Sequence, residues 1–374
     1  MKKQIVKEFI TVKKVRYLPR EAPPPPPPPA RRVLIVGLCT LDIINVCDEQ
    51  LTPGCQTRTK DGYWRPGGFA TNTCNVLRRL GNDCEFLGQL TSAPAFESLY
   101  SSFQTMGIDI SNCPRSPKQP AHRTFFAVRG QTVRITAEYT TWQHELSYQQ
   151  FMGAVDYRQY SWIHFESRNF KETVRMILAV RDYNARTPDT DIVLSVDLFD
   201  LRPHSILLAA FADYVLVHRR VKTAYGYMNG REIVWAVRNK MNVVRKCWLA
   251  KQPKKSPYIT IDEQVPQKVD NSCTAEAEAH EPTIIYDNYD EGASCLAPGG
   301  VYFKVGAHKP QKIVDTIGEH ETFVGAFIFA IQVVKLSLRD AMEYGTRAIC
   351  LKISKNGFDH LRCMPKDLIS CYYA

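Results

Sequence analysis

Short apolar runs separated by amphipathic stretches recur along most of this chain. The run Val33–Val36 closes on Gly37, as a buried strand does. Apolar residues then recur at helical spacing from Ala70 to Leu80, where Gly81 supplies a stop signal. The pattern continues with strands expected at 85–88, 162–165, 192–196, 214–217 and 284–286, and with helices at 96–106 and 171–183. Strands that alternate with helices predict an α/β fold with a mostly parallel sheet covered on both faces.

Two segments break this alternation. Residues 121–141 carry two strand-like stretches on either side of Gly130-Gln131, which predicts a β-hairpin. Residues from about 246 to 282 are rich in Lys, Pro, Ala and Glu, and this composition is typical of an exposed insertion.

The beginning of the chain has a different character from the rest. Seven consecutive prolines, Pro23 to Pro29, predict an extended polyproline II spacer rather than a packed element. The spacer separates a basic, proline-rich tail over residues 1–32 from a globular domain over 33–374. Two interpretations of it stay open, a solvated linker or a docking segment for a partner with an SH3-like or WW-like groove.

The net charge of +10 is unevenly distributed. Residues 1–32 hold nine basic side chains against two acidic ones, a net +7, so the globular part carries only +3. A basic face across the fold is therefore not indicated, and we do not expect nucleic-acid binding.

The compartment is predicted from features that the sequence lacks. The twelve cysteines include no C-x-x-C pair and no paired ligand spacing, so we expect no metal site among them. The apolar residues near the start are interrupted by Lys7 and Glu8, which disfavours a secretory signal. Because no run of about 18 apolar residues occurs, no membrane span is expected either. The reducing cytoplasm is the expected location.

Candidate chemistry is concentrated in the last fifth of the chain. The two commonest nucleotide fingerprints, G-x-x-x-x-G-K-[ST] and G-x-G-x-x-G, are both missing from the sequence. Instead, Val314–Phe323 leads into Val324–Val334, an apolar stretch expected to be helical. A loop that ends at a helix start presents unpaired backbone N–H groups, which makes this turn a candidate anion site.

Five short motifs then stand in order along the chain. They are Gly37-Leu38-x-x-Leu41-Asp42, Gly67-Gly68-x-Ala70-x-Asn72, Trp162-Ile163-His164-x-Glu166-x-Arg168-Asn169, Asp315-Thr316-x-Gly318 and Gly357-Phe358-Asp359. Together they resemble the ribokinase-type carbohydrate kinases and, within that family, the ketohexokinases, which phosphorylate fructose at its 1-hydroxyl. The resemblance covers nearly all of residues 33–362.

The resemblance implies a ribokinase-like three-layer sandwich with a mostly parallel central sheet and a small β-sheet lid. Here the lid corresponds to about 43–66 and 121–141. Lids of this family can pair between subunits, so the resemblance also implies a homodimer. If the chain is active, it implies ATP and Mg²⁺ as cofactors and a ketose as substrate.

Site residues follow from the same resemblance. Asp42, Gly68 and Asn72 match positions that hold the sugar, and Glu321 matches the carboxylate that accepts the proton of the sugar hydroxyl. The turn Gly318, Glu319 and His320 matches the anion hole for the transferred phosphoryl group. Asp290, Gly292, Gly357 and Asp359 match the nucleotide side, and Glu166 with Arg168 is expected to form an ion pair that shapes the cleft. Arg219 or Arg220 is either a direct ligand of nucleotide phosphate or a solvated arginine at a strand end.

The sequence departs from the family where the chemistry is done. The first Asn of the sugar-holding helix is Phe69, which cannot hydrogen-bond a hydroxyl. A lid carboxylate that ketohexokinases direct at the sugar falls at Gly54. The stretch His218–Val221 lacks the carboxylate that organises magnesium in many relatives. The Gly-Ala-Gly-Asp turn reads Gly-Glu-His-Glu over 318–321, which adds charge and bulk where phosphate must approach.

These departures predict a slow or silent kinase and leave alternatives open. Glu321 is either a displaced but working base, with His320 offsetting the charge of Glu319, or an ordinary residue that stabilises the helix start with Glu319. In the second case the chain is a catalytically silent pseudokinase. It would then act as a binding or dimeric scaffold protein through its lid and its proline-bearing tail.

Overall fold

The computed structural model describes residues 31–49, 52, 54, 56–128, 134–141, 144–187, 191–250 and 281–366. Its strands are β1 (Arg32–Val36), β2 (Thr40–Cys47), β3 (Asp61–Gly67), β4 (Cys84–Leu87), β5 (Leu90–Thr91), β6 (Arg115–Ser116), β7 (His122–Val128), β8 (Arg134–Tyr139), β9 (Tyr160–Glu166), β10 (Val193–Leu198), β11 (Tyr214–Val217), β12 (Thr283–Asn288), β13 (Gly292–Leu296) and β14 (Tyr302–Val305). Its α-helices are α1 (Phe69–Leu80), α2 (Glu97–Met106), α3 (Tyr148–Ala154), α4 (Phe170–Arg186), α5 (Pro203–Ala209), α6 (Arg220–Tyr225), α7 (Gly230–Ala250), α8 (Glu319–Phe329) and α9 (Leu338–Ile353). None of these described helices is long and apolar enough to cross a membrane.

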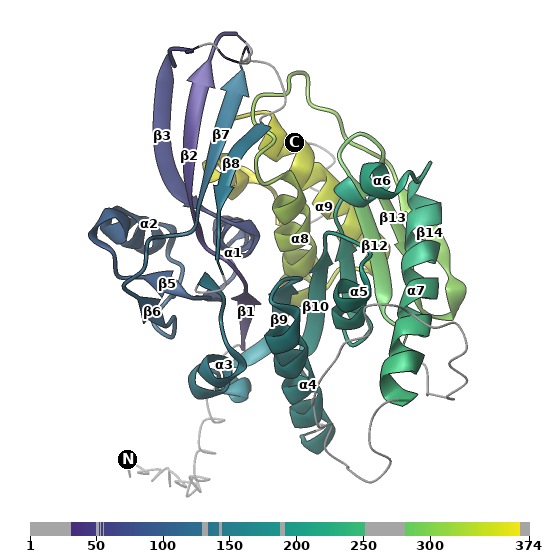
Figure 1. Ribbon diagram of the computed structural model, residues 1–374. Helices are drawn as coiled ribbons and strands as arrows, with labels where there is room; N and C mark the ends of the chain where they lie inside the picture. Colours follow the sequence, from purple (N-terminus) through teal and green to yellow (C-terminus); the bar gives the residue numbers. More distant parts are fainter. Residues whose placement is uncertain are drawn as a thin grey trace, which may run out of the picture. The chain divides into compact units, whose positions relative to one another are not determined.

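The main sheet has eight strands in the order β14-β13-β12-β11-β10-β9-β1-β4 (Figure 1). All neighbours from β12 to β4 pair in parallel, and β13 and β14 extend the sheet as an antiparallel edge. The predicted mostly parallel sheet is confirmed. The antiparallel edge was not predicted, because its strands lack the long apolar runs of the central ones.

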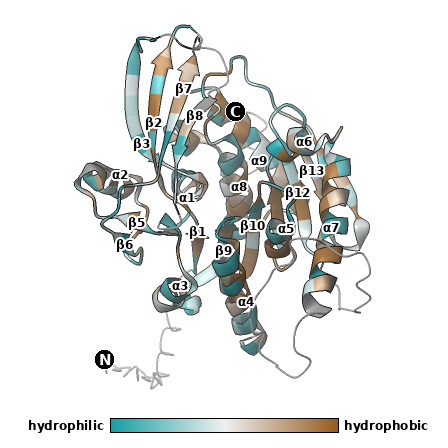
Figure 2. Cartoon of the chain, in the orientation of Figure 1, coloured by the Kyte–Doolittle hydropathy of each residue, from teal (hydrophilic) through white to brown (hydrophobic). Residues whose placement is uncertain are grey.

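Successive residues along the inner strands belong to two separate hydrophobic cores, one on each face of the main sheet. In β1, Val33 and Ile35 pack with α1, α8 and α9, whereas Leu34 and Val36 pack with α4, α5 and α7. Because strand side chains alternate between faces, an all-apolar strand requires cover on both sides. Figure 2 shows this as brown inner strands and a largely brown α8. The expected three-layer α/β sandwich is confirmed.

A second sheet has four strands in the order β3-β2-β7-β8, and we call it the small sheet. It contains the segments expected to form the lid, and it stands apart from the main sheet in Figure 1. Ile44 and Phe125 on its inner face pack against Ile317, which precedes α8. The small sheet therefore closes over the start of that helix. The turn expected at Gly130-Gln131 lies outside the described residues.

Two expected boundaries are corrected. Helix α7 runs through Ala250 with Cys247 and Trp248 buried, so residues 246–250 belong to a packed helix and not to an exposed insertion. The remainder of that insertion, 251–280, lies outside the described residues, as does the chain before Arg31, including the proline run. The helix continues because its buried positions keep the 3.6-residue period, despite the basic residues between them.

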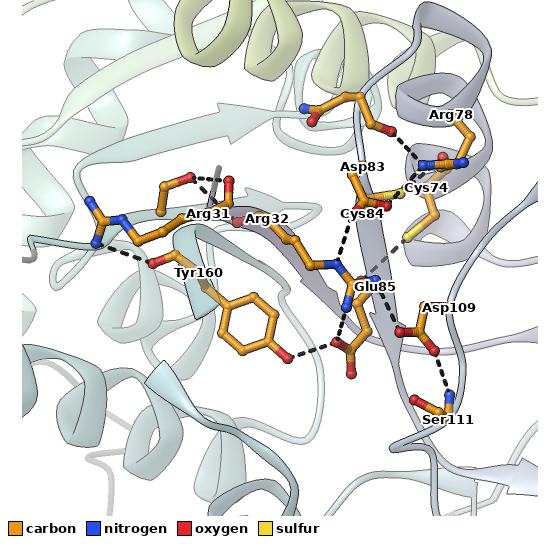
Figure 3. A network of polar contacts seen from close by, with 12 residues as sticks. Arg31, Arg32, Cys74, Arg78, Asp83, Cys84, Glu85, Asp109, Ser111 and Tyr160 are labelled. Carbon is orange, nitrogen blue, oxygen red and sulfur yellow. Dashed lines mark hydrogen bonds and ion pairs between the residues drawn. The ribbon is translucent and has the colours of Figure 1, made fainter. Parts of the chain in front are cut away.

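The fold also begins earlier than expected, because Arg32 is part of it. Its guanidinium lies 3.0 Å from Asp83, 3.3 Å from Glu85 and 3.0 Å from Asp109. The hydroxyl of Tyr160 donates to the buried Glu85 over 2.7 Å. Figure 3 shows these side chains converging where β1 starts. An arginine that neutralises a buried carboxylate is a structural residue, so Arg32 belongs to the domain rather than to the tail.

Candidate functional site

The carboxyl ends of β1, β9, β10 and β12 meet at one edge of the main sheet, as parallel strands require. The chain leaving β1 enters the small sheet through β2, which carries Asp42. Helix α1 begins immediately after the small sheet and packs beside α8, where a Cβ on Gly325 would come within 2.8 Å of Val76. The absent side chain lets the middle of α8 approach the middle of α1.

Two residues predicted from the family motifs are in direct contact here. The side-chain amide of Asn72 donates to Glu321 Oε1 over 3.1 Å. Both side chains are buried, and burial raises the pKa of Glu321 above its usual value although His320 and Asn72 oppose the shift. The sugar-side amide and the expected base therefore share one small region.

Asp42 is held tightly against the glycines that follow β3. Its Oδ1 accepts a hydrogen bond of 2.7 Å from the hydroxyl of Thr40, and only 1% of the residue is exposed. A Cβ on Gly67 would overlap the Asp42 carboxylate, and one on Gly68 would overlap the carbonyl oxygen of Leu38. Burial raises the pKa of Asp42, and nearby Arg65 opposes that rise. Close packing thus requires Gly67 next to this carboxylate and Gly68 next to the backbone of Leu38.

The turn before α8 is closed by its own side chains. Gly318 adopts φ 84°, and a Cβ there would run into the ring of Phe358. The next three residues are each at most 5% exposed. His320 points into the protein, where Nδ1 lies 2.7 Å from Asp287 Oδ1 and Nε2 lies 3.3 Å from Asp197 Oδ1. A side chain thus fills the position where the family has only a glycine.

The chain of polar contacts continues into the sheet. His164 Nε2 lies 3.1 Å from Asp197 Oδ2, close but not aligned as a hydrogen bond. Its Nδ1 is 2.7 Å from Ser195 Oγ, which also accepts from Trp162 Nε1 over 2.7 Å. Because the indole can only donate, the serine proton is free to point at Nδ1.

Charge on these groups follows from their surroundings. Burial alone lowers the pKa of His320, but Asp287 and Asp197 raise it well above the ordinary value. Burial would raise the pKa of Asp197, yet His164 and His320 hold it below its usual range. Burial raises the pKa of Asp287 against the opposing effect of His320. An imidazolium clamped between two carboxylates is the consistent picture at neutral pH.

Glu319 forms a second internal ion pair. Its Oε1 contacts the Nε of Arg219, whose guanidinium lies 5.0 Å from the centre of the Tyr289 ring. Burial raises the pKa of Glu319 to about 8, although Arg219 opposes the rise. Arg219, a predicted nucleotide residue, does reach the turn. The group that it contacts there is the carboxyl of Glu319, which belongs to the turn itself.

Aromatic rings lie beside the sugar-holding positions. Phe69 and Phe199 have ring centres 4.3 Å apart, and the guanidinium of Arg123 lies 5.0 Å from the Phe69 ring. His218 packs 5.4 Å from Phe199, and burial followed by the charge of His320 lowers its pKa well below normal. A neutral, largely aromatic wall thus stands where a polar sugar contact was expected from the family.

The predicted ion pair of Glu166 and Arg168 is present, with Nη1 3.1 Å from Oε1. Arg168 also binds Glu145 at 2.6 Å. Glu166 Oε2 accepts the backbone N–H of Leu38 over 2.9 Å. Because Leu38 lies on the path from β1 to Asp42, Glu166 fixes the backbone that leads to this predicted sugar residue.

The other predicted nucleotide residues make structural contacts. Gly292 lies in the β12–β13 turn at φ 88°, where a Cβ would overlap the carbonyl of Val305, and Asp290 is exposed in the same turn. Gly357 donates its N–H to Asp315 Oδ2 over 3.0 Å. Asp359 is paired at the surface with Arg79, at 2.7 Å. Asp290 and Asp359 are thus engaged in turns and surface pairs.

Reasoning from sequence missed Asp197 and Asp287. Each stands near the end of a buried strand, after Leu194-Ser195-Val196 and Ile284-Ile285-Tyr286. A polar residue at the carboxyl end of an apolar run in an α/β sheet is the signal that could have found both.

A bound triphosphate and magnesium would need donors and an open approach at this turn. In the arrangement described, an added anion would face the carboxylates of Glu319, Glu321 and Asp287, while His320 and Arg219 are already paired. The described residues also include no group of three or more His, Cys, Asp or Glu side chains arranged to hold a metal ion. The side chains of the turn therefore do not fit a transferred phosphoryl group.

Comparisons with known proteins agree with the fold and the motifs. The model of the pfkB family carbohydrate kinases matches residues 30–174. Ketohexokinase of Mus musculus is 27% identical over 331 residues, which are 88% of this chain and 98% of that protein. Among solved structures, a ribokinase from Thermotoga maritima matches with TM-score 0.64 at 13% identity, over 92% of this chain and 100% of its own. The ribokinase of Arabidopsis thaliana in complex with ribose and ATP matches with TM-score 0.63 at 15% identity, over 92% and 98%.

Proposed function

We propose that the chain is a ribokinase-like carbohydrate kinase related to ketohexokinase, in which transfer of a phosphoryl group from ATP to a ketose such as fructose is slow or lost. The observation that carries this proposal is His320, clamped between Asp197 and Asp287 at the turn that would receive the phosphoryl group. The sugar side, with Asp42 and Asn72, is proposed to be retained.

Magnitudes support a severe rather than a mild defect. Losing preorganised donors to a developing anion typically costs about 100-fold or more in rate. Misplacing a catalytic carboxylate by about 1 Å costs roughly another 100-fold. An extra carboxylate at the phosphate position adds repulsion on the order of 4 kcal/mol at 4 Å. Glu319, His320 and Glu321 bring all three effects to one turn.

The test is release of ADP by the full chain with ATP, Mg²⁺ and a panel of ketoses. We expect no sugar-dependent ADP above background for the wild type. The triple variant with Glu319→Ala, His320→Gly and Glu321→Asp rebuilds a small turn that ends in Asp, and gain of sugar-dependent turnover there would locate the defect in this turn. Sugar-dependent turnover by the wild type at an ordinary kinase rate would contradict the proposal.

One observation favours a second candidate, an active kinase that uses Glu321 as its base. The 3.1 Å hydrogen bond from Asn72 to Glu321 supports this role, because Asn72 is a proposed sugar residue, and the raised pKa of Glu321 suits a proton acceptor. If ADP release is found, Glu321→Gln should abolish it while leaving ketose binding intact. In this candidate ATP and Mg²⁺ are the cofactors.

A scaffold role is the form that the silent protein would take, in the cytoplasm. The small sheet supports pairing of two copies, because Trp64 on its edge strand β3 is 65% exposed and Tyr63 is 37% exposed. Sedimentation of the full chain should report a dimer that Trp64→Ser weakens. A partner for the proline-rich tail is proposed from the sequence alone.

A further inference from the structure

Four charged residues stand side by side across the small sheet, one on each strand. In register, Arg65 on β3 lies opposite Asp42 on β2, Asp42 lies beside Arg123 on β7, and Arg123 lies opposite Glu138 on β8. Directly opposed residues of neighbouring strands point to the same face. We call these residues the charge row. Its sugar-binding member is Asp42, so Arg65 and Arg123 flank the position where a ligand of that carboxylate would lie.

Arg65 and Arg123 differ in how many of their N–H donors have a hydrogen-bond acceptor. Arg123 is buried, donates to Glu138 through Nε at 3.3 Å and Nη2 at 3.1 Å, and packs over Phe69. Arg65 has two buried nitrogens, Nε and Nη2, with no hydrogen-bond acceptor among the described residues. Leaving a buried charged donor unsatisfied is costly, and native proteins rarely do so without a reason.

The surroundings of Arg65 provide no acceptor in its place. Its guanidinium lies 5.5 Å from the centre of the Phe358 ring, and Lys352 Nζ lies 5.0 Å from the same ring. The neighbouring carboxylate Asp315 is already bound by Lys352 at 3.0 Å and by two backbone N–H groups. Asp42 Oδ1 accepts from Thr40. Arg65 is thus a cation near Asp42 and Asp315, and two of its buried N–H groups have no acceptor among the described residues.

We propose that the ligand of the sugar side carries an anionic group, a carboxylate or a phosphate, and that Arg65 binds it. The planar fork of a guanidinium matches two oxygens of either group, and such charge-assisted hydrogen bonds are the strong ones. The inference rests on the proposed retention of the sugar side and names its ligand class as acidic sugars.

Calorimetry on the full chain tests the inference without any phosphoryl transfer. The probes are fructose, the sugar acid 2-ketogluconate, fructose 6-phosphate and inorganic phosphate alone. We expect a sugar acid or a sugar phosphate to bind about 10- to 100-fold more tightly than fructose, the range for one charge-assisted hydrogen-bond pair. The preferred probe then identifies whether the anion is a carboxylate or a phosphate.

Variants separate Arg65 from a general charge effect. Arg65→Gln should remove the preference for the acidic probe, while Arg65→Lys should keep part of it. Arg339→Gln is the matched control, since this exposed arginine packs on Phe303 at the other edge of the main sheet and should change nothing. Thermal melts report whether each variant folds. If Arg65→Gln does not fold, the calorimetric titrations of the wild type with the four probes still decide the question.

Three outcomes would overturn the inference: fructose binding as tightly as the acidic probes, inorganic phosphate alone binding as tightly as they do, or no probe binding. The second outcome would mean an adventitious ion only. None of them alters the ADP assay, so failure here is distinguishable from failure of the proposed loss of phosphoryl transfer.

Discussion

The Nδ1 of His320 lies 2.7 Å from Asp287 Oδ1, which joins the first turn of α8 to the end of β12. On its other side His320 reaches Asp197 on β10. One side chain therefore ties a helix start to two strands of the main sheet, and both of its partners are buried anions. Breaking a buried pair of this kind by removing one member typically costs about 3–5 kcal/mol.

Replacing His320 by Gln should lower the free energy of unfolding by that amount at neutral pH and change its pH dependence. The folded-state pKa of His320 lies well above that of the unfolded chain, about 6.5. Its stabilisation is therefore complete below pH 6.5 and lost as pH rises through the higher folded value. Chemical denaturation from pH 6 to 10 should show that the difference in unfolding free energy between wild type and variant decreases as the pH rises.

His204→Gln is the control for this experiment, because His204 is a partly exposed residue stacked on Phe170 outside the network. A gap between wild type and His320→Gln that stays constant up to pH 10 would show that His320 is not charged in the folded protein.

Between about pH 4.5 and pH 8 the unfolding free energy of the wild type should fall as Glu319 ionises, and Glu319→Gln should remove this fall. Burial raises the folded-state pKa of Glu319 to about 8, so the folded state holds its proton longer than the unfolded state. Stability of the wild type then falls with rising pH across that interval, by at most about 1.4 kcal/mol per pH unit. The difference between wild-type and variant unfolding curves, measured at four pH values, should have this slope. If the difference in unfolding free energy between wild type and variant does not change with pH, the raised pKa of a buried Glu319 is contradicted.

Gly67→Ala should displace Asp42, because the added Cβ would overlap its carboxylate. We expect a loss of about 1–3 kcal/mol in unfolding free energy, the usual cost of overpacking. Gly62→Ala on the same strand is the matched control, since the nearest atom to its Cβ would be the Ile44 carbonyl oxygen at 3.5 Å. Equal effects of the two substitutions in urea denaturation would indicate that strand propensity, rather than Asp42, decides the result.

Phe69→Asn should cost stability and raise the affinity for fructose. The ring is lost from its contact with Phe199 and from beneath Arg123, together on the order of 1–3 kcal/mol. The new amide can hydrogen-bond a sugar hydroxyl. Calorimetry with fructose, alongside a thermal melt, checks both effects. A folded variant with unchanged fructose affinity would mean that Phe69 is not what limits neutral sugar binding.

The sheet could be predicted from sequence because its strands are apolar on both faces and its helices keep one apolar stripe. Runs such as Val33–Val36 and Tyr214–Val217 admit no other placement. The last residues of helix α7 were assigned to an exposed insertion because lysines and arginines near the end of the helix mask the buried Val244, Cys247 and Trp248. Strands β13 and β14 were missed because they are short and their apolar pattern is weak.

The site was only half accessible from sequence. Motifs identified Asp42, Asn72 and the 318–321 turn, and the contact of Asn72 with Glu321 brings two of these parts together. What His320 does depends on carboxylates 123 and 33 residues away, and no local pattern links such positions. The same holds for Arg65, whose importance comes from strand register and from an acceptor that the described residues lack.

The charge row also has a consequence for assembly of the small sheet. A slip of one strand by a single residue would turn its charged side chain to the opposite face and leave its neighbours without an oppositely charged partner. The alternating charges of Arg65, Asp42, Arg123 and Glu138 therefore favour the observed register of the four strands. The spacing of the Arg65 and Arg123 guanidinium groups would then be set while the sheet folds, before any ligand binds.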